Sequence, residues 1–202
     1  MHGFPALRCR GGPPELAVKT ITIFGSSLPV EGSAAYADAQ RLGRLLAKAG
    51  HAVCNGGYAG LMEASARGAR EAGGHTIGVT CTIWPRAANP YIVEEVHTHS
   101  FPQRLMTLVE RGDAYVVLPG GTGTLAELAL CWEIMNKRSL LKAMGGRKPL
   151  LVAAPYWQPV IDCLRQEQEL NCADAGSIAA AMDVITLFET PEQAVERLCK
   201  NF

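Results

Sequence analysis

The chain has 202 residues, of which 48% are hydrophobic and 19% are charged, and its formal net charge at pH 7 is zero. This composition is typical of a globular domain with a substantial core and argues against long disordered segments. Basic and acidic residues both number 19, so no overall positive field exists to attract a nucleic acid or an anionic membrane. We therefore expect a small molecule as partner.

Seven cysteines, with no CxxC pair among them, suggest neither a disulfide framework nor a zinc site. They favour a reducing compartment, and we expect a cytoplasmic protein. Residues 1–19 hold no apolar run long enough for a signal peptide or a membrane span, so we interpret them as a flexible N-terminal tail before a single domain at 20–202. His97 and His99 share a strand face but lack further ligands, and we expect no metal ion and no cofactor.

Short apolar strands alternate with amphipathic helices along residues 20–202. The expected strands are Thr20–Phe24, His51–Cys54, His75–Thr80, Glu94–His97, Ala114–Leu118, Leu150–Ala153 and Val184–Phe188. The expected helices are Ala34–Ala49, Gly60–Ala72, Phe101–Arg111, Thr124–Leu141, Gln158–Gln168 and one opened by Thr190-Pro191-Glu192, with Cys81–Val93 irregular. This alternation predicts a Rossmann-like α/β fold, in which a mostly parallel sheet carries helices on both faces.

The most informative turn follows the apolar run Ala114–Leu118, which is expected to be a buried central strand. Ligands of parallel sheets lie beyond the carboxyl ends of the strands, and here glycine amides and threonine hydroxyls meet a helix N-terminus, an arrangement that suits a phosphate. A purely structural turn would not need so many glycines and hydroxyls. No G-K-[ST] run follows, so this is not a P-loop. The expected phosphate-binding residues are Gly120, Gly121, Thr122, Gly123 and Thr124.

Two further turns contain glycine. After the first strand come Gly25, Ser26 and Ser27, which could approach an anion, although a tight strand-to-helix turn would use the same residues. After the second strand, Gly56 and Gly57 lead into a helix whose positive end could face a ligand. A dinucleotide site would require GxGxxG after the first strand and an acid at the end of the second. The second strand ends in Cys54-Asn55, which argues against an NAD-dependent oxidoreductase.

The segment Pro119–Glu127 matches the PGGxGTxxE signature of the LONELY GUY family, and Gly56–Met62 resembles the family's GGGxxGLM segment. The chain resembles this family over roughly residues 20–153. The resemblance implies a dimeric nucleotide-binding protein that hydrolyses a nucleoside 5′-monophosphate, such as AMP or a cytokinin-type purine riboside monophosphate, to free base and ribose 5-phosphate. It also implies that Glu127 is the signature carboxylate and that Arg104 is the catalytic arginine.

The chain departs from the family at three places. Leu105 stands where a lysine usually follows the arginine, Asn55 stands where glycine is more common, and Trp84–Tyr91 differs from the acidic substrate loop of the plant enzymes. The sequence assigns no role to Arg86–Tyr91. The family's lysine decarboxylase label has no support, because no lysine lies in a recognisable pyridoxal phosphate motif.

The implied chemistry needs a carboxylate, because breaking an N-glycosidic bond develops positive charge on the ribose ring. Glu127 suits this role, and we expect the positive helix end to keep it ionised, although such a residue can also merely complement the helix dipole. Arg104 could pair with phosphate or ribose oxygens or orient the leaving base. Its alternative is a solvated position on an amphipathic helix.

A second functional hypothesis is a non-catalytic nucleotide-binding protein or a molybdenum cofactor carrier. Such a protein needs the glycine loops but not both Arg104 and Glu127. The helix Thr124–Leu141 is apolar nearly all round, so it is either core or in part a homodimer face near the site. The resemblance favours the homodimer face for Trp132 to Met135.

Overall fold

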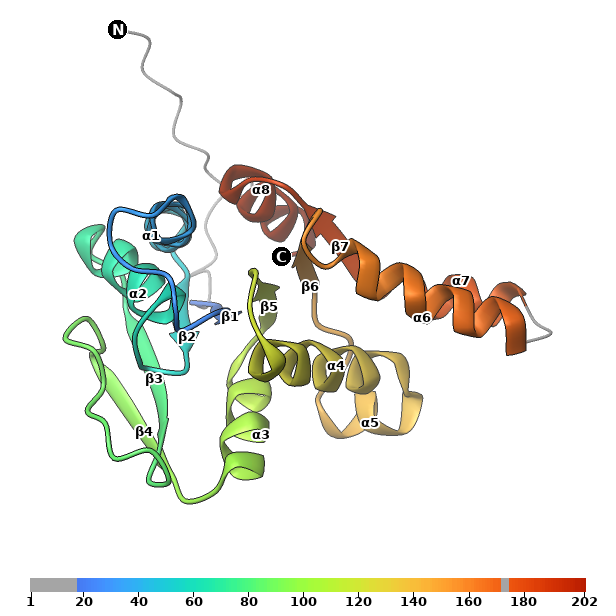
Figure 1. Cartoon of the computed structure of the whole chain (residues 1–202), viewed down its shortest axis with the longest axis horizontal. Helices are drawn as coiled ribbons and strands as arrows, with labels where there is room; N and C mark the ends of the chain where they lie inside the picture. The colour runs from blue at the N-terminus through green and yellow to red at the C-terminus, as the bar shows by residue number, and fades with distance from the viewer. Residues whose placement is uncertain (1–17, 172–174) are drawn as a thin grey trace, which may run out of the picture.

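The computed structural model describes residues 18–171 and 175–202, in which strands and helices alternate (Figure 1). The strands are β1 Thr20–Phe24, β2 Ala52–Asn55, β3 Thr76–Cys81, β4 Glu94–Thr98, β5 Ala114–Val117, β6 Leu150–Ala153 and β7 Ile185–Phe188. The helices are α1 Ala34–Lys48, α2 Leu61–Glu71, α3 Phe101–Arg111, α4 Thr122–Asn136, α5 Arg138–Ala143, α6 Gln158–Asn171, α7 Ala175–Met182 and α8 Pro191–Asn201. Most of the expected N-terminal tail, at 1–17, lies outside the described residues.

The sheet has the strand order β4-β3-β2-β1-β5-β6-β7, and every neighbouring pair is parallel. Helices α1, α2 and α8 pack together on one face, and α3 and α4 cover the other (Figure 1). The Rossmann-like α/β prediction is confirmed, with a sheet that is parallel throughout. The chain winds outward from β1 to β4 and then crosses back to β5 on the other side of β1. Ligand sites of such sheets lie at this reversal, which the turns after β1 and β5 flank.

The middle of the sheet is buried on both faces, as continuous apolar strands require. Every residue of β5 is buried, and so is every residue of β2. Side-chain caps fix the start of the helices beside it: Ser33 accepts the amide of Tyr36, and Thr190 accepts the amide of Gln193 with proline in the first turn. Each cap satisfies one of the amides that a helix end leaves without a partner, and the predicted start at Thr190-Pro191 is confirmed.

The prediction of one helix over Thr124–Leu141 is wrong. Lys137 is extended, with φ −97° and ψ 116°, and separates α4 from α5. Its N–H donates to the Glu133 carbonyl and closes α4, while its own carbonyl accepts from Leu140 and Leu141 and begins α5. No glycine or proline marks this break in the sequence. Helix α7 is a second difference, since the sequence reading placed no element there.

Trp132 and Met135 pack as core, the first of the two alternatives, and not as the dimer face that the resemblance favours. Met135 is fully buried within the chain, and Trp132 is buried with its indole Nε1 donating to the Ala181 carbonyl at 3.0 Å. These side chains therefore belong to the chain's own core, which explains the apolar character of α4. Within residues 18–171 and 175–202, no helix is long and apolar enough to cross a membrane.

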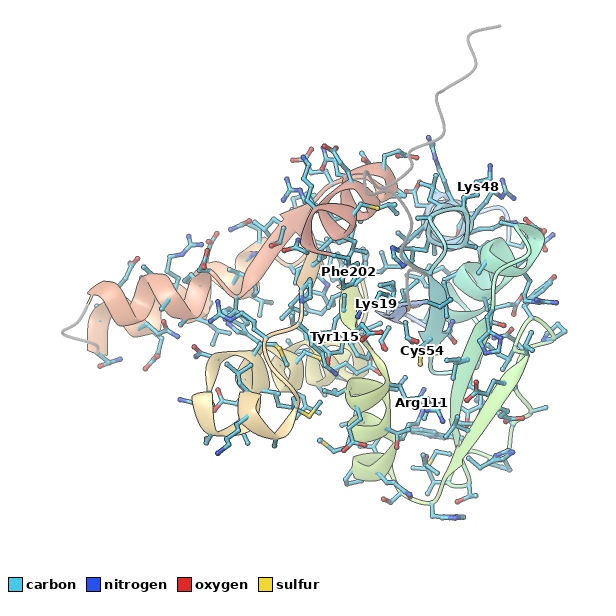
Figure 2. All side chains as sticks on the ribbon, turned by 180° about the vertical axis from the view of Figure 1, so that it is seen from behind. Lys19, Lys48, Cys54, Arg111, Tyr115 and Phe202 are labelled. Carbon is cyan, nitrogen blue, oxygen red and sulfur yellow. The ribbon has the colours of Figure 1, made fainter. Side chains whose placement is uncertain are left out.

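His51, just before β2, is a buried titratable group that makes no hydrogen bond through its ring in the described residues. It is 8% exposed, and neither ring nitrogen has a hydrogen-bond partner in the described residues. Its ring lies edge-on to Phe202, with 5.5 Å between centroids, and the Lys19 ammonium lies 5.7 Å from the Phe202 ring (Figure 2). Burial lowers the pKa of the imidazole, an effect that Asp113 opposes and Lys19 assists.

We predict that His51 makes the fold less stable in mild acid. Because its pKa is lower in the folded chain, the unfolded state takes up a proton first as the pH falls below about 6.5, and folding stability is lost over that range. His51→Leu removes this contribution. Urea unfolding at pH 7.5 and pH 5.5 should show a smaller loss of stability for the variant than for the wild type, and equal losses would contradict the prediction.

Candidate active site

The turn after β5 ends in an uncapped helix N-terminus. Gly121 is the N-cap of α4, and no side chain caps the helix there. Gly121, Thr122 and Gly123 are exposed, and their amides have no acceptor in the part of the chain that the structure describes. Free amides at the positive end of a helix form an anion-binding site. The arrangement suits the phosphate expected at Gly120–Thr124.

Close packing requires glycine at one position of this turn but not at two others. A Cβ atom added at Gly121 or Gly123 would meet no atom within 4 Å, and neither residue has a positive φ. Packing and backbone conformation therefore do not require glycine at these two positions, where a side chain would fill the space above the free amides. At Gly120, in contrast, a Cβ atom would lie 2.2 Å from Thr124 Oγ1, so this glycine lets the turn pack on the helix.

The turn after β1 lies beside Gly120–Thr124, the turn that we call the phosphate loop because a phosphate is expected there. The Ser26 amide donates to the Pro119 carbonyl at 3.0 Å, and the Ser26 hydroxyl accepts from the Leu28 amide at 3.1 Å. A Cβ atom at Gly25 would lie 3.1 Å from Leu61 and 3.3 Å from Leu118, so close packing accounts for this glycine. The Ser26 hydroxyl proton and the exposed Ser27 are the groups of this turn that remain open to a ligand.

Two of the amides that the sequence suggested for ligand binding after β2 are used within the chain. The Gly57 amide donates to Asn55 Oδ1 at 2.8 Å, and the Leu61 amide at the start of α2 donates to the Ser26 carbonyl at 2.9 Å. The Asn55 side chain also donates to the Met62 carbonyl at 2.9 Å. Internal acceptors therefore use the Gly57 amide and the first amide of α2, and the ligand-binding role expected for Gly56 and Gly57 stays a prediction. Asn55, at a position where the family favours glycine, holds this turn together.

Gly56 makes room for Arg104, the expected catalytic arginine. A Cβ atom at Gly56 would lie 1.8 Å from Arg104 Nη2. Arg104 lies in the first turn of α3 and is 6% exposed. Its Nε donates to the Val79 carbonyl at 2.8 Å and its Nη2 to the Gly56 carbonyl at 3.1 Å. The solvated helix position is thus excluded, and a bidentate pair through Nε and Nη2 is not open to a ligand.

The remaining guanidinium nitrogen of Arg104, Nη1, faces the carboxyl group of Glu127. Arg104 Nη1 lies 3.9 Å from Glu127 Oε1, which comes from the second turn of α4. The Glu127 side chain is 12% exposed. Burial raises its pKa to about 7, and Arg104 acts in the opposite direction. Burial therefore acts against the positive helix end, which was expected to help keep Glu127 ionised. A carboxyl poised between its two forms near neutral pH can serve acid or base chemistry.

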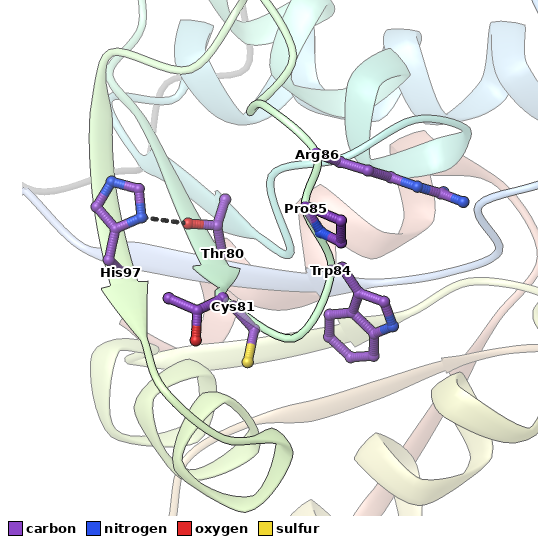
Figure 3. A pocket seen from close by; sticks show the side chains of 7 residues that line it. Thr80, Cys81, Trp84, Pro85, Arg86 and His97 are labelled. Atoms are coloured by element: carbon purple, nitrogen blue, oxygen red, sulfur yellow. Dashed lines mark hydrogen bonds between the residues drawn. The ribbon is translucent and has the colours of Figure 1, made fainter.

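Aromatic rings enclose the other side of the guanidinium. The centre of the Arg104 guanidinium lies 5.3 Å from the Trp84 ring and 5.6 Å from the Tyr58 ring. Trp84 also forms one wall of a hollow of about 320 Å³ at the carboxyl ends of β3 and β4 (Figure 3). The lining residues are Thr80, Cys81, Thr82, Trp84, Pro85, Arg86 and His97. Among the described residues, no three His, Cys, Asp or Glu side chains are placed to hold a metal ion.

The segment Arg86–Tyr91, to which the sequence assigned no role, is hydrogen-bonded to the turn after β2. The buried Asn89 side chain donates to the carbonyls of Gly57 at 3.1 Å and Tyr58 at 2.9 Å. The only sequence signal for this contact is an amide residue beside Pro90. Asn89 therefore ties this segment to the turn after β2. Trp84 lies beside both Arg104 and the hollow and so connects the hollow with the pair of Arg104 and Glu127.

Comparison with known proteins agrees with this geometry. The sequence profile of the SLOG cluster4 family matches residues 18–168. The cytokinin riboside 5′-monophosphate phosphoribohydrolase of Rhodococcoides fascians is 34% identical over 121 residues, which are 57% of this chain and 61% of the relative. A probable enzyme of the same name from Oryza sativa subsp. japonica is 32% identical over 151 residues, 72% of this chain and 57% of the relative. The chain thus spans about three fifths of these curated relatives.

Solved structures share the whole fold. The X-ray structure of TM1055 is 27% identical with a TM-score of 0.66, covering 91% of this chain and 99% of that one. The molybdenum cofactor binding protein of Rippkaea orientalis is 23% identical with a TM-score of 0.67, covering 92% and 98%, and at this identity the likeness shows the fold alone. The profile match extends from before β1 into α6, and the chain belongs to the SLOG cluster4 family.

Proposed function

We propose that this protein is a nucleoside 5′-monophosphate phosphoribohydrolase, which hydrolyses AMP or a cytokinin-type purine riboside monophosphate to free base and ribose 5-phosphate. One observation supports this above the others: a buried Glu127 with a raised pKa faces a buried Arg104 beside the open phosphate loop. A carrier of a phosphate-bearing cofactor would need the loop but not this pair. The names of the curated relatives point the same way.

In this proposal the substrate lies along the carboxyl edge of the sheet. Its phosphate binds the amides of Gly121, Thr122 and Gly123. Glu127 is one helical turn further along α4, about 6 Å along the axis from Gly123, so the ribose ring lies between the phosphate and the carboxyl. The base then extends past Arg104 toward Trp84 and the hollow. Trp84 offers an aromatic surface of the kind on which bases stack.

The reaction breaks the bond from C1′ to the base nitrogen, and the bonding electrons leave with the base. The ionised form of Glu127 stabilises the positive charge that develops on the ribose ring. A water molecule adds to C1′ and gives up a proton, and the departing base takes up one proton, so that the products are base and ribose 5-phosphate. Arg104 Nη1, which is not tied to the backbone, faces the place where the base would gain electrons.

Phosphate recognition gives the first prediction for this site. AMP should bind about a hundredfold more tightly than adenosine, because the free amides at the start of α4 have no partner in a nucleoside. Gly123→Ala should weaken AMP binding by filling the space above the amides. It should not lower the melting temperature, since alanine favours a helix over glycine by about 0.5–1 kcal/mol. Calorimetry that gives AMP and adenosine equal affinity would rule out this site.

Glu127→Gln separates an enzyme from a carrier. The change keeps the side chain's size and removes its charge, so release of free base from AMP, followed by chromatography, should fall by about a hundredfold, roughly 3 kcal/mol of transition-state stabilisation. AMP affinity should change little. Glu133→Gln, at an exposed position of α4 paired with Lys137, is the matched control and should leave turnover unchanged. Wild-type protein that binds AMP but releases no base would favour the carrier.

The same variant tests the raised pKa. If the ionised carboxyl is the active form, kcat/KM of the wild type should rise with pH through about 7, and the residual activity of Glu127→Gln should lack that rise. Because the folded-state pKa lies above the ordinary 4.5, stability falls as the pH rises from 4.5 to 7. The variant lacks this titration, so its melting temperature should fall less between pH 5 and pH 8 than that of the wild type.

We also infer a cytoplasmic homodimer, with a small-molecule nucleotide as the only other partner. Apolar side chains on the outer helices support it: Leu140 on α5, and Leu164 and Leu170 on α6, are exposed, and α6 and α7 project away from the sheet (Figure 1). Exposed apolar groups of this kind favour association. Light scattering should give twice the chain mass of 21.6 kDa, and a mass of one chain would contradict the inference.

A further inference from the structure

The turn after β6 contacts the phosphate loop through two aromatic side chains. Trp157 is buried, and its Nε1 donates to the Leu118 carbonyl at 3.0 Å. Tyr156 is 52% exposed, and its hydroxyl donates to the Gly120 carbonyl at 2.8 Å. The two rings meet edge to face, with 5.1 Å between centroids, so the buried indole supports the more exposed phenol.

With these two contacts, three consecutive carbonyls of the phosphate loop accept hydrogen bonds from other turns. The turn after β1 supplies the third bond, from the Ser26 amide to the Pro119 carbonyl at 3.0 Å. The carbonyls of three consecutive residues, 118 to 120, are thus held by donors from outside the loop, and the Gly121 carbonyl accepts from Leu125 within α4 at 2.9 Å. The carbonyls are held while the amides at the start of α4 stay open.

Holding a carbonyl also orients an amide. The Gly120 carbonyl and the Gly121 N–H belong to one planar trans peptide group, so they point in opposite directions. This peptide lies between two glycines, which makes its rotation easier than that of any peptide between residues with side chains. A rotated peptide would turn the carbonyl oxygen, with its partial negative charge, toward a bound phosphate.

We propose that Tyr156 is a positioning residue for the phosphate: its hydroxyl locks the Gly120–Gly121 peptide in the orientation that points the Gly121 amide at the ligand. The inference rests on the proposed function in taking this loop as the phosphate site. The ligand class is a phosphate monoester, and Tyr156 acts on it through the backbone without touching it.

Tyr156→Phe removes only the hydroxyl. Calorimetry with ribose 5-phosphate as the probe should show affinity lower by about fivefold or more, the usual effect of losing one hydrogen bond. KM for AMP should rise by a similar factor while kcat is unchanged, because Glu127 and Arg104 are untouched. Adenosine binding should not change, since adenosine has no phosphate. The melting temperature should barely move, because the phenol is half exposed.

Tyr115→Phe is the matched control, since it removes the same kind of bond from β5 itself. The Tyr115 hydroxyl donates to the Val109 carbonyl at 2.7 Å in the buried core (Figure 2). This variant should lose stability and keep its affinity for ribose 5-phosphate, the reverse of Tyr156→Phe. Wild-type affinity in Tyr156→Phe would overturn the inference and leave the proposed function standing. Wild-type protein that does not bind ribose 5-phosphate would overturn both.

Discussion

The buried guanidinium of Arg104 is the constraint on which the candidate site depends. A buried charge is costly unless it is paired and hydrogen-bonded, and Arg104 meets this condition with partners from three parts of the chain. The carbonyls of Gly56, just after β2, and of Val79, in β3, accept hydrogen bonds from it. Two aromatic rings flank it, and Glu127 of α4 faces it. Gly56 is glycine because this guanidinium occupies the space beside it. One side chain thus fixes how two turns and a helix meet at the carboxyl edge of the sheet.

In the proposed function, phosphate binding and cleavage of the glycosidic bond depend on different features of the structure. The phosphate loop lies at the reversal of the strand order between β1 and β5, where its carbonyls are held by neighbouring turns and its amides stay open. The carboxyl one turn along α4 is buried instead, and burial gives it a pKa that an exposed glutamate at a helix start would not have. The same helix therefore has an open, polar N-terminal end and an enclosed carboxyl one turn further on, which in the proposed function serve the phosphate and the ribose.

Much of the fold and of the candidate site was predictable from local sequence. Strand runs such as Ala114–Leu118 and the Thr190-Pro191 cap carry their signals in adjacent residues, and the glycines and threonines of 120–124 mark by type and spacing the turn whose amides are open at the start of α4. What the sequence did not show depended on tertiary contacts. The break at Lys137 has no glycine or proline, the burial of Trp132 depends on Ala181 of a helix that the sequence did not reveal, and the protonation of Glu127 depends on how deeply α4 is covered.

The bonds made by Arg104 and Tyr156 were beyond sequence reasoning for the same reason. Each joins residues far apart in the chain, 25 and 48 positions for Arg104 and 36 for Tyr156. A signature can therefore identify a loop as a candidate phosphate site, but not the side chains that hold that loop in shape. Those depend on which strands become neighbours in the sheet.

The most direct test of the central claim is a crystal structure of Glu127→Gln with AMP, in which slowed hydrolysis keeps the substrate intact. We predict that the phosphate binds the amides of Gly121, Thr122 and Gly123, that C1′ of the ribose lies beside the side chain at 127, and that the base lies beyond Arg104 toward Trp84. A phosphate bound away from the start of α4, or a ribose turned away from position 127, would contradict it.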